Sequence, residues 1–400
     1  MKLFLKTLIF GVLILFQIKV LKAQEEVDFK PLIDYDNGLG IVAPDTSYYI
    51  NFRFRMQNRM GLFTKSIDDL NVDEVEARVR RLRLRMDGFL ISPKFSYYIQ
   101  LSFSRGDQDW DNSQVPNVVR DALVFYFVND NLYFGFGQSK LPGNRQRVIS
   151  SGMQQFVDRS IVNATLNIDR DFGIRAFYEN KIGDKSIYKL QAAVTSGEGR
   201  NALNSDNGLA YTGRVEFLPF GGFTNNGDYF EGDLAREKKP KLSLGSSYSY
   251  NQKARRTGAQ IGNFISSPVD ISTFIADFMF KYNGFAMLGE FVNRTSSQKI
   301  VTDANLGLPT YIFNGGGANL QMSYLLPSNF EVATRYAYIN SAASISDFNK
   351  GFNEMTLGLT KYFKDHRIKF QSNLAYLHNH ESLNNGNGRW ALLFQFEVGI

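Results

Sequence analysis

Polar and apolar residues alternate along most of this chain, so that every second side chain is apolar. In Tyr48–Met60 the even positions are mostly aromatic or aliphatic, whereas the odd positions are mostly Asn, Arg and Gln. A period of two predicts a β-strand with one apolar and one polar face. The pattern recurs in about 16 segments, and no segment of comparable length has a convincing 3.6-residue period. The approximate starts of these segments are residues 48, 78, 94, 120, 131, 171, 185, 208, 240, 271, 284, 316, 329, 353, 366 and 389.

One segment departs from this alternation. Val118–Phe127 is apolar on both faces, so its register is ambiguous. The last segment, by contrast, places Trp390, Leu392 and Phe394 on one face and continues in that way to the end of the chain.

The connections between the predicted strands alternate between short and long. Six are tight turns, such as Ser92-Pro93 and Asn283-Gly284. A transmembrane β-barrel has short periplasmic turns and long outer loops. If the first strand rises from the periplasm, only residues 219–239 break this rule, because they form a long link on the periplasmic side. The long links expected on the outer side are residues 61–77, 105–119, 139–170, 197–207, 252–270, 295–315, 341–352 and 379–388.

These features together predict an all-β fold, a 16-stranded antiparallel transmembrane β-barrel with long outer loops and short periplasmic turns. A soluble β-sandwich or β-propeller would also alternate. However, the predicted strands are about 10–12 residues long, whereas strands of about 5–6 residues are usual. Phe, Tyr, Leu and Ile also fill nearly every position of the apolar face, as on a surface that meets lipid. A barrel of this size has a lumen too wide for side chains to fill, so the polar faces should line a water-filled channel.

The N-terminus has the pattern of a secretory signal. Lys2 and Lys6 precede the apolar run Leu8–Phe16, and Ala23 follows at the expected cut. A membrane anchor is the alternative, but the uninterrupted run is about nine residues, against the roughly 20 that a spanning helix needs. We therefore expect residues 1–23 to be a signal peptide and 24–400 to form a single barrel domain.

Charge and composition narrow the possible functions. The net charge of the full chain is +6, and removing the signal, which holds four Lys and no acid, leaves about +2. The mature protein is therefore not strongly basic, and we expect no nucleic-acid partner. The chain has no Cys and only three His, so we expect no disulfide, no metal site and no cofactor. Any electrostatic function must come from the arrangement of the charges.

Arginine is concentrated on the polar faces of the first two predicted strands. Same-face neighbours on a strand lie about 6.6–7 Å apart, so six guanidiniums on adjacent strands could form a ladder down one wall. Rows of Arg and Lys are one way in which pores select anions. The alternative is a generic charged wall, in which acids such as Asp87 pair with the arginines. Arg78 and Arg80 fall on the other register and are expected above the membrane. The six ladder residues are Arg53, Arg55, Arg59, Arg81, Arg83 and Arg85.

The link 139–170 is unusually long for a connection inside a compact structure. Its apolar members, including Ile149, Phe156 and Val162, suggest that it packs against something. Folded into the lumen, it would narrow the pore and carry its basic side chains to the constriction. The alternative is an extracellular lid. The basic residues concerned are Lys140, Arg145, Arg147 and Arg159.

The region Arg81–Asn180 resembles the phosphate-selective porins of the Gram-negative outer membrane. The matching runs include Arg-Leu-Arg-Leu-Arg-Met-Asp-Gly from residue 81, Gly-Phe-Gly-Gln-Ser-Lys-Leu-Pro from residue 135 and Arg-Asp-Phe-Gly from residue 170. The resemblance extends over most of the chain from about residue 45. It implies a trimeric 16-stranded barrel, a third loop folded inward, and basic residues along the anion path. By position these are Arg81, Arg83, Arg85, Lys140, Arg145, Arg147 and Arg159.

We therefore predict a non-enzymatic, diffusive porin of the outer membrane that prefers anions, with phosphate selectivity as the sharper hypothesis. Its expected partners are small anions, outer-membrane lipid and two further copies of the chain. A general non-selective porin and a phospholipase-like barrel enzyme are the alternatives. The enzyme would need a Ser–His–acid site, and His366, His378 and His380 have no evident Ser partner in the sequence. About 24 residues between the signal and the first strand are too few for the plug of a gated transporter.

Overall fold

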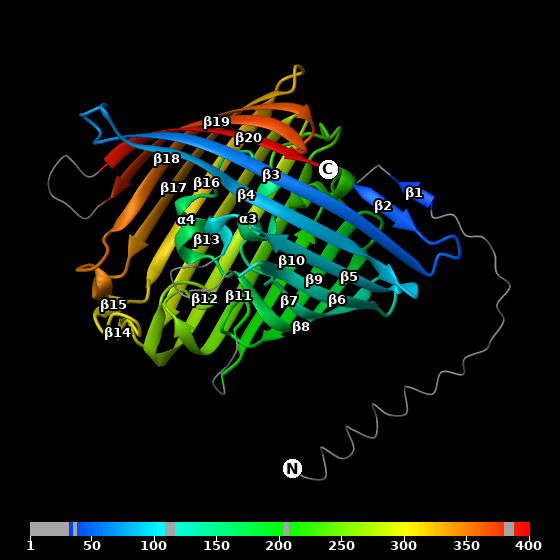
Figure 1. Cartoon of the computed structure of the whole chain (residues 1–400), viewed down its shortest axis with the longest axis horizontal. Helices are drawn as coiled ribbons and strands as arrows, with labels where there is room; N and C mark the ends of the chain where they lie inside the picture. The colour runs from blue at the N-terminus through cyan, green and yellow to red at the C-terminus, as the bar shows by residue number, and fades with distance from the viewer. Residues whose placement is uncertain (1–31, 35–37, 109–116, 203–207, 380–387) are drawn as a thin grey trace, which may run out of the picture.

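Sixteen long strands form a closed antiparallel barrel in the computed structural model, which describes residues 32–34, 38–108, 117–202, 208–379 and 388–400 (Figure 1). Each strand pairs with the next, and the last pairs with the first, which closes the ring. The prediction of 16 antiparallel strands is confirmed. The strands are β3 (Tyr48–Thr64), β4 (Val72–Leu90), β5 (Ser92–Ser102), β6 (Val119–Phe127), β7 (Leu132–Lys140), β8 (Arg170–Ile182), β9 (Ser186–Thr195), β10 (Ala210–Leu218), β11 (Lys241–Arg256), β12 (Phe264–Tyr282), β13 (Phe285–Ser296), β16 (Gly315–Leu325), β17 (Phe330–Ser341), β18 (Gly351–Lys364), β19 (Ile368–Asn379) and β20 (Gly388–Gly399).

Fourteen of the sixteen predicted starts lie within two residues of the observed ones. The two exceptions are β4 and β12, which begin six and seven residues earlier than predicted. These strands extend at the long-loop end of the barrel, so the expected links 61–77 and 252–270 are partly strand. A β-bulge also interrupts β4 opposite Gln57 and Asn58. Because a bulge adds a residue to one strand, it shifts the two-residue period that the sequence pattern follows.

The apolar face of the strands is the outside of the barrel. In β17, for example, Phe330, Val332 and Tyr336 are exposed, whereas Glu331 and Arg335 between them are buried in the interior. This arrangement reverses that of a soluble protein, in which the apolar side chains would form the core. The alternation of the sequence therefore sorts residues into an apolar exterior and a polar lumen.

A short hairpin precedes the barrel and was not predicted. It consists of β1 (Leu32–Asp34) and β2 (Leu39–Val42), and β2 pairs with residues Tyr49–Phe52 at the start of β3. Strand β20 pairs with the continuation of the same edge, from Arg55 to Phe63. The hairpin and the last strand therefore share one edge of β3.

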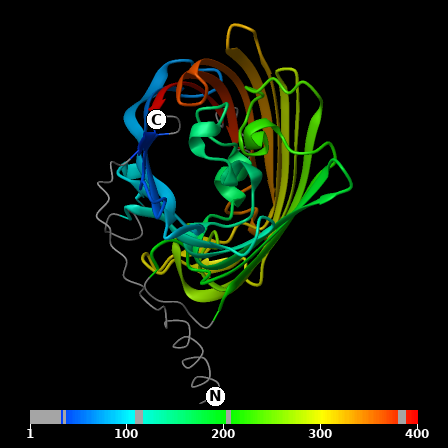
Figure 2. The same cartoon turned by 90° about the vertical axis from the view of Figure 1, so that its right-hand side faces the viewer.

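The long connection between β7 and β8 folds into the barrel, as Figure 2 shows. It carries α3 (Arg145–Val148), the 3-10 turn η2 (Ser151–Met153) and α4 (Ile161–Leu166). Val162 and Leu166 of α4 pack on the inner wall in a buried cluster that includes Ile339. The prediction that this loop enters the lumen is confirmed, and the lid alternative is wrong. The helices of the described residues are all too short to cross a membrane.

A second segment enters the lumen from the opposite end of the barrel. It comprises residues 219–240, the link whose length broke the expected alternation, and contains η3 (Thr224–Tyr229). The backbone N–H of Glu231 donates to Met153 O of the 141–169 loop at 2.9 Å. The ammonium of Lys281 on β12 donates to Gly227 O at 2.7 Å. The lumen is therefore narrowed from both ends by segments that touch each other.

Candidate functional site

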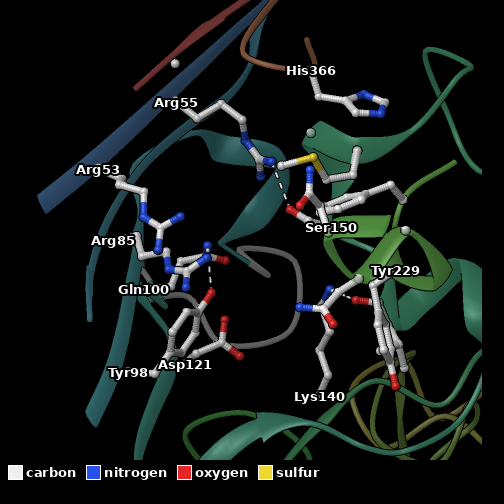
Figure 3. A pocket seen from close by; sticks show the side chains of 18 of the residues that line it. Arg53, Arg55, Arg85, Tyr98, Gln100, Asp121, Lys140, Ser150, Tyr229 and His366 are labelled. Atoms are coloured by element: carbon white, nitrogen blue, oxygen red, sulfur yellow. Dashed lines mark hydrogen bonds between the residues drawn. The ribbon is translucent and has the colours of Figure 1, made fainter. Parts of the chain in front are cut away.

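Two adjoining cavities run through the part of the lumen that these segments leave open. The inner cavity, of about 1200 Å³, lies between the wall β3–β8 and the 219–240 segment (Figure 3). The outer cavity, of about 230 Å³, lies toward the long-loop end, near Gly106 and Ile261. Both are lined by Arg83, Lys140 and Arg170, which therefore mark the boundary between them. A solute that crosses the barrel along this path passes the three cations.

The outer cavity is strongly positive. Among the described residues, nine basic side chains and two carboxylates line it, an excess of seven positive charges. Like charges that lie close together repel, so a cluster of cations destabilises the folded protein unless nearby carboxylates reduce the repulsion. The charged side chains that line the outer cavity are Arg80, Arg81, Arg83, Arg120, Lys140, Arg147, Arg159, Arg170, Arg200, Asp107 and Asp169.

The two carboxylates compensate part of this charge. Asp107, in the turn η1 (Arg105–Asp107), accepts from Arg83 Nε at 2.7 Å and lies 3.1 Å from Arg120 Nη1. Burial opposes its ionisation, but the neighbouring guanidiniums hold its pKa well below the usual value. Asp169 accepts from Arg147 Nε at 2.8 Å and from Arg170 Nη1 at 3.3 Å. Each of the two carboxylates therefore serves two guanidiniums.

Three cations of the outer cavity are held by neutral groups instead. Arg81 Nη1 donates to the amide oxygen of Gln57 at 2.7 Å. Arg159 Nε donates to Gln146 O at 2.6 Å, and Lys140 Nζ donates to Val148 O at 2.8 Å. Within the described residues, none of these three has a carboxylate within ion-pair distance. These hydrogen bonds fix the orientation of the three side chains.

The strand register places arginines directly opposite one another. Arg53 pairs with Arg85, and Arg55 pairs with Arg83, along the inner face of β3 and β4. Like charges at opposed positions destabilise a sheet. Asp87 reduces the repulsion in the first pair, because it lies 2.9 Å from Arg53 Nη2 and 2.7 Å from Arg85 Nε. Figure 3 shows Arg53, Arg55 and Arg85 on one side of the inner cavity.

Arg55 reaches from this wall to the inward loop. Its guanidinium donates to Ser150 Oγ at 3.0 Å and to Ser151 Oγ at 2.9 Å. Glu397 of β20 lies 3.7 Å away. The residue therefore lines the inner cavity and also holds η2 against β3.

Two of the predicted site residues line neither cavity. Arg59 is bound by two acids, Glu76, whose Oε2 accepts from Nη2 at 2.7 Å, and Asp158 of the inward loop. The side chain of Arg145 is 1% exposed and is bound on the opposite wall, with Nε 2.5 Å from Asp277 Oδ1 and Nη2 3.5 Å from Glu216. Both residues therefore hold the connection between β7 and β8, residues 141–169, inside the barrel.

The prediction that Arg80 falls on the outward register is wrong. It lines the outer cavity, and its Nη2 lies 3.4 Å from Asp158 Oδ1. The bulge opposite Gln57 and Asn58 is the cause, because it changes the register of β4 between Val79 and Arg81. The expectation of the other register is wrong for Arg78 as well, because Arg78 pairs with the inward-facing Arg59. It nevertheless lines neither cavity: its Nε donates to Glu76 Oε1 at 2.7 Å, and its side chain is 48% exposed.

Several cavity residues were not identified from the sequence. Arg120 lies in the segment whose register was ambiguous, while Arg175 and Arg200 lie outside the two strands and the loop that drew attention. A usable signal existed for Arg120, because Arg120-Asp121 is a lone charged pair in an otherwise apolar run. Asp121 accepts from Arg170 Nε at 2.9 Å.

Comparison with known proteins bears on this geometry. The family model of phosphate-selective porin O and P matches residues 50–390. A protein of Aquifex aeolicus (strain VF5), described as uncharacterized, is 24% identical over 330 residues, which are 76% of either chain. The anion-selective porin from Comamonas acidovorans superposes with a TM-score of 0.54 at 12% identity, over 88% of this chain and 100% of that one. OmpT of Vibrio cholerae, in its trimer form, superposes with a TM-score of 0.54 at 10% identity, over 88% of this chain and 99% of that one.

Proposed function

Since the chain belongs to the phosphate-selective porin O and P family, it is a porin of the Gram-negative outer membrane, and we propose that its channel prefers anions. The observation that carries this proposal is the outer cavity, where seven positive charges are in excess among the described residues. A narrow passage with low-dielectric walls concentrates ions of the opposite sign and repels those of the same sign. Chloride or phosphate would therefore enter more readily than potassium.

In this mechanism the basic side chains act in sequence along the path. An anion enters among Arg81, Arg147 and Arg159, crosses the boundary at Arg83 and Lys140, and then meets the arginines of the inner cavity. Each guanidinium replaces part of the hydration shell of the ion. Conduction requires that no single site holds the ion too firmly, and the partial compensation by Asp107 and Asp169 supports this. We assign Arg53, Arg55, Arg81, Arg83, Arg85, Lys140, Arg147 and Arg159 to the path, and Arg59 and Arg145 to the support of the loop.

Selectivity for phosphate is the sharper form of the proposal. A guanidinium presents two parallel N–H donors, which match two oxygens of phosphate and have no such match in chloride. The closely spaced cations of the outer cavity could bind one phosphate from several sides. If so, phosphate should reduce the chloride current at concentrations well below that of chloride.

The test is the reversal potential of the purified protein in a planar bilayer under a KCl gradient, repeated with added phosphate. The variant R81Q/R159Q removes two cations that no carboxylate compensates, so the potential should move toward zero. The matched control is R78Q, because Arg78 lies on the same strand and lines neither cavity. A wild-type potential of zero, or equal potentials in all three proteins, would reject the anion preference and favour a general porin.

The general porin has some support in the ion pairs of Arg53, Arg85 and Arg59 with acids. The enzyme alternative has less. His366 Nε2 contacts Glu231 O at 3.2 Å, and its Nδ1 lies 3.4 Å from Lys369 Nζ, an arrangement that does not activate a serine. His380 lies outside the described residues. The family and the fold both indicate a channel.

We further propose a homotrimer surrounded by outer-membrane lipid, with residues 1–23 removed as a signal peptide. The trimer form of the similar OmpT structure supports the assembly, and the exposed apolar face of the strands supports the lipid contact. Residues 1–23 lie outside the described residues. Chemical cross-linking in detergent and N-terminal sequencing of the exported protein would test these points, and a monomeric protein or an uncut N-terminus would contradict them.

A further inference from the structure

A row of aromatic rings crosses the luminal face of β6, β7 and β8. The register pairs Phe127 with Tyr133, and Tyr133 with Phe177. Their rings stack, with centroids 4.8 Å and 4.6 Å apart and interplanar angles of 23° and 10°. Phe125 adds a fourth ring, 6.0 Å from that of Tyr133 and 6.4 Å from that of Phe177. We refer to these four rings as the aromatic row.

The aromatic row faces the water-filled side of the wall. Phe125 and Phe177 line the inner cavity and are half-buried. The outer surface of the same strands carries other aromatic residues, Tyr126, Phe134 and Phe136, which are exposed. This part of the barrel is therefore apolar on both faces, which explains why the register of Val118–Phe127 could not be read from its sequence.

The backbone is adapted to hold Phe125 against the wall. Its partner in the register is Gly135, and a Cβ placed there would lie 3.3 Å from the Phe125 ring, closer than most such contacts. The ring therefore lies over the glycine, an arrangement that is known to stabilise strands containing glycine. The wall gains a flat apolar surface at this point.

On other strands the luminal face is polar, as at Glu331 and Arg335 of β17, or its apolar side chains are covered by the inward segments, as Ile339 is by α4. A contiguous apolar surface that faces water is costly, and such surfaces often mark binding sites. Tyr229 of the 219–240 segment offers a further ring across the cavity from Tyr98 (Figure 3). It is positioned by Lys189, whose Nζ lies 5.2 Å from the ring centroid, and by a 3.4 Å hydrogen bond from Gln191 Nε2.

One cation, Arg175, lies beside the aromatic row. Arg175 precedes Phe177 by two residues on the same face of β8, about 7 Å away, and also lines the inner cavity. It is 1% exposed, and all four of its Nη–H donors bond backbone carbonyls, among them Gly137 O at 2.8 Å and Asp171 O at 2.7 Å. It therefore contributes a buried positive charge and no free hydrogen-bond donor of its Nη groups. Among the described residues, no carboxylate lies within ion-pair distance of Arg175 or of Lys140, which lines the same cavity.

We propose that the inner cavity binds organic anions that carry an aromatic ring. The ring stacks on Phe125 and Phe177, and the carboxylate or phosphate group is attracted by the buried charge of Arg175 and by the basic side chains that line the same cavity. The inference rests on the proposed anion preference and adds the class of solute. Inorganic anions use the basic side chains alone, whereas an aryl anion gains the stacking contact with the rings as well.

The test compares benzoate with acetate, which carry the same charge and the same carboxylate. Each is added to the purified wild-type channel in a planar bilayer, and the concentration that halves the chloride conductance is measured. We expect benzoate to act at a concentration about ten times lower than acetate, a difference of about 1.4 kcal/mol. Equal concentrations for the two anions would overturn the inference.

The variant F125L/F177L keeps apolar volume while removing the rings, and should bring benzoate to the level of acetate without changing the acetate value. The control F136L removes an exposed outward-facing ring and should behave as the wild type. The reversal potential in the KCl gradient is recorded for each protein. If the wild type is anion-selective but F125L/F177L has the same benzoate value as the wild type, this inference alone is refuted. A wild-type reversal potential of zero would refute the proposed function.

Discussion

Arg145 provides the sharpest test of how the inward loop is held. The substitution R145M replaces a fully buried guanidinium by an apolar side chain of similar length. It removes the contacts with Asp277 Oδ1 at 2.5 Å and Ser243 Oγ at 2.9 Å. It also leaves Arg214 as the nearest cation for both Asp277 and Glu216, at 2.7 Å and 2.6 Å. In the wild type two guanidiniums, Arg145 and Arg214, face two carboxylates, whereas in R145M a single guanidinium faces both carboxylates.

The size of the effect follows from this imbalance. Removing one partner of a buried ion pair costs about 3–5 kcal/mol, because a charge stays buried without compensation. Each 1.4 kcal/mol is a factor of ten, so the equilibrium between the docked and released loop shifts by roughly two to three and a half powers of ten. A released loop no longer narrows the lumen. We expect a larger and noisier single-channel conductance, a weaker anion preference and faster proteolysis within residues 141–169.

Two further variants decide whether charge is the cause. R145M/D277N removes one of the two carboxylates and should recover part of the lost stability. R294M removes a buried guanidinium that holds the same loop only through carbonyls such as Asn167 O, at 2.9 Å, so its cost should be nearer 1–3 kcal/mol. The reasoning is refuted if R145M conducts like the wild type, or if D277N worsens the defect of R145M instead of relieving it.

Three other results are expected. The variant D107N should strengthen the anion preference, measured as reversal potential, because it removes one of the two carboxylates of the outer cavity. Lowering the pH from 7 to 5 should leave the reversal potential unchanged, because nearby arginines hold the pKa of Asp107 and Asp169 well below the usual value despite their burial. Only below about pH 4 should protonation of these carboxylates make the outer cavity more positive and raise the anion preference. The stability that the two ionised carboxylates contribute is lost over the same range. Deletion of residues 224–235 should raise the single-channel conductance, and an unchanged conductance would show that this segment does not narrow the path.

The strands could be predicted from the sequence because all sixteen face the same two environments, lipid on one side and the lumen on the other. Each strand presents an apolar face outward and a polar face inward, so its period survives even where its neighbours differ. The pattern fails at the outer ends of β4 and β12, which extend beyond the apolar band, and at the bulge near Arg80. The hairpin β1–β2 is too short to carry a period at all.

The site could be predicted only in part, since its geometry depends on partners that are distant in the sequence. The basic residues of the third loop were visible, but nothing local distinguishes Arg147, which lines the outer cavity, from Arg145, whose partner Asp277 is 132 residues away. The length of the link 219–240 was visible, whereas its inward course depends on contacts with Met153 and Lys281.

The shared edge of β3 has a consequence for how the barrel avoids self-association. An unpaired strand edge is a template on which another chain can add a strand. The last strand, β20, ends opposite Arg55, and β2 pairs with the preceding residues of the same edge, from Phe52 to Tyr49. The amide of Ile400 bridges the junction by donating to Phe54 O at 3.2 Å. The N-terminal hairpin thus continues the pairing of this edge beyond the end of β20, so that within the described residues β3 offers a neighbouring molecule no long unpaired stretch.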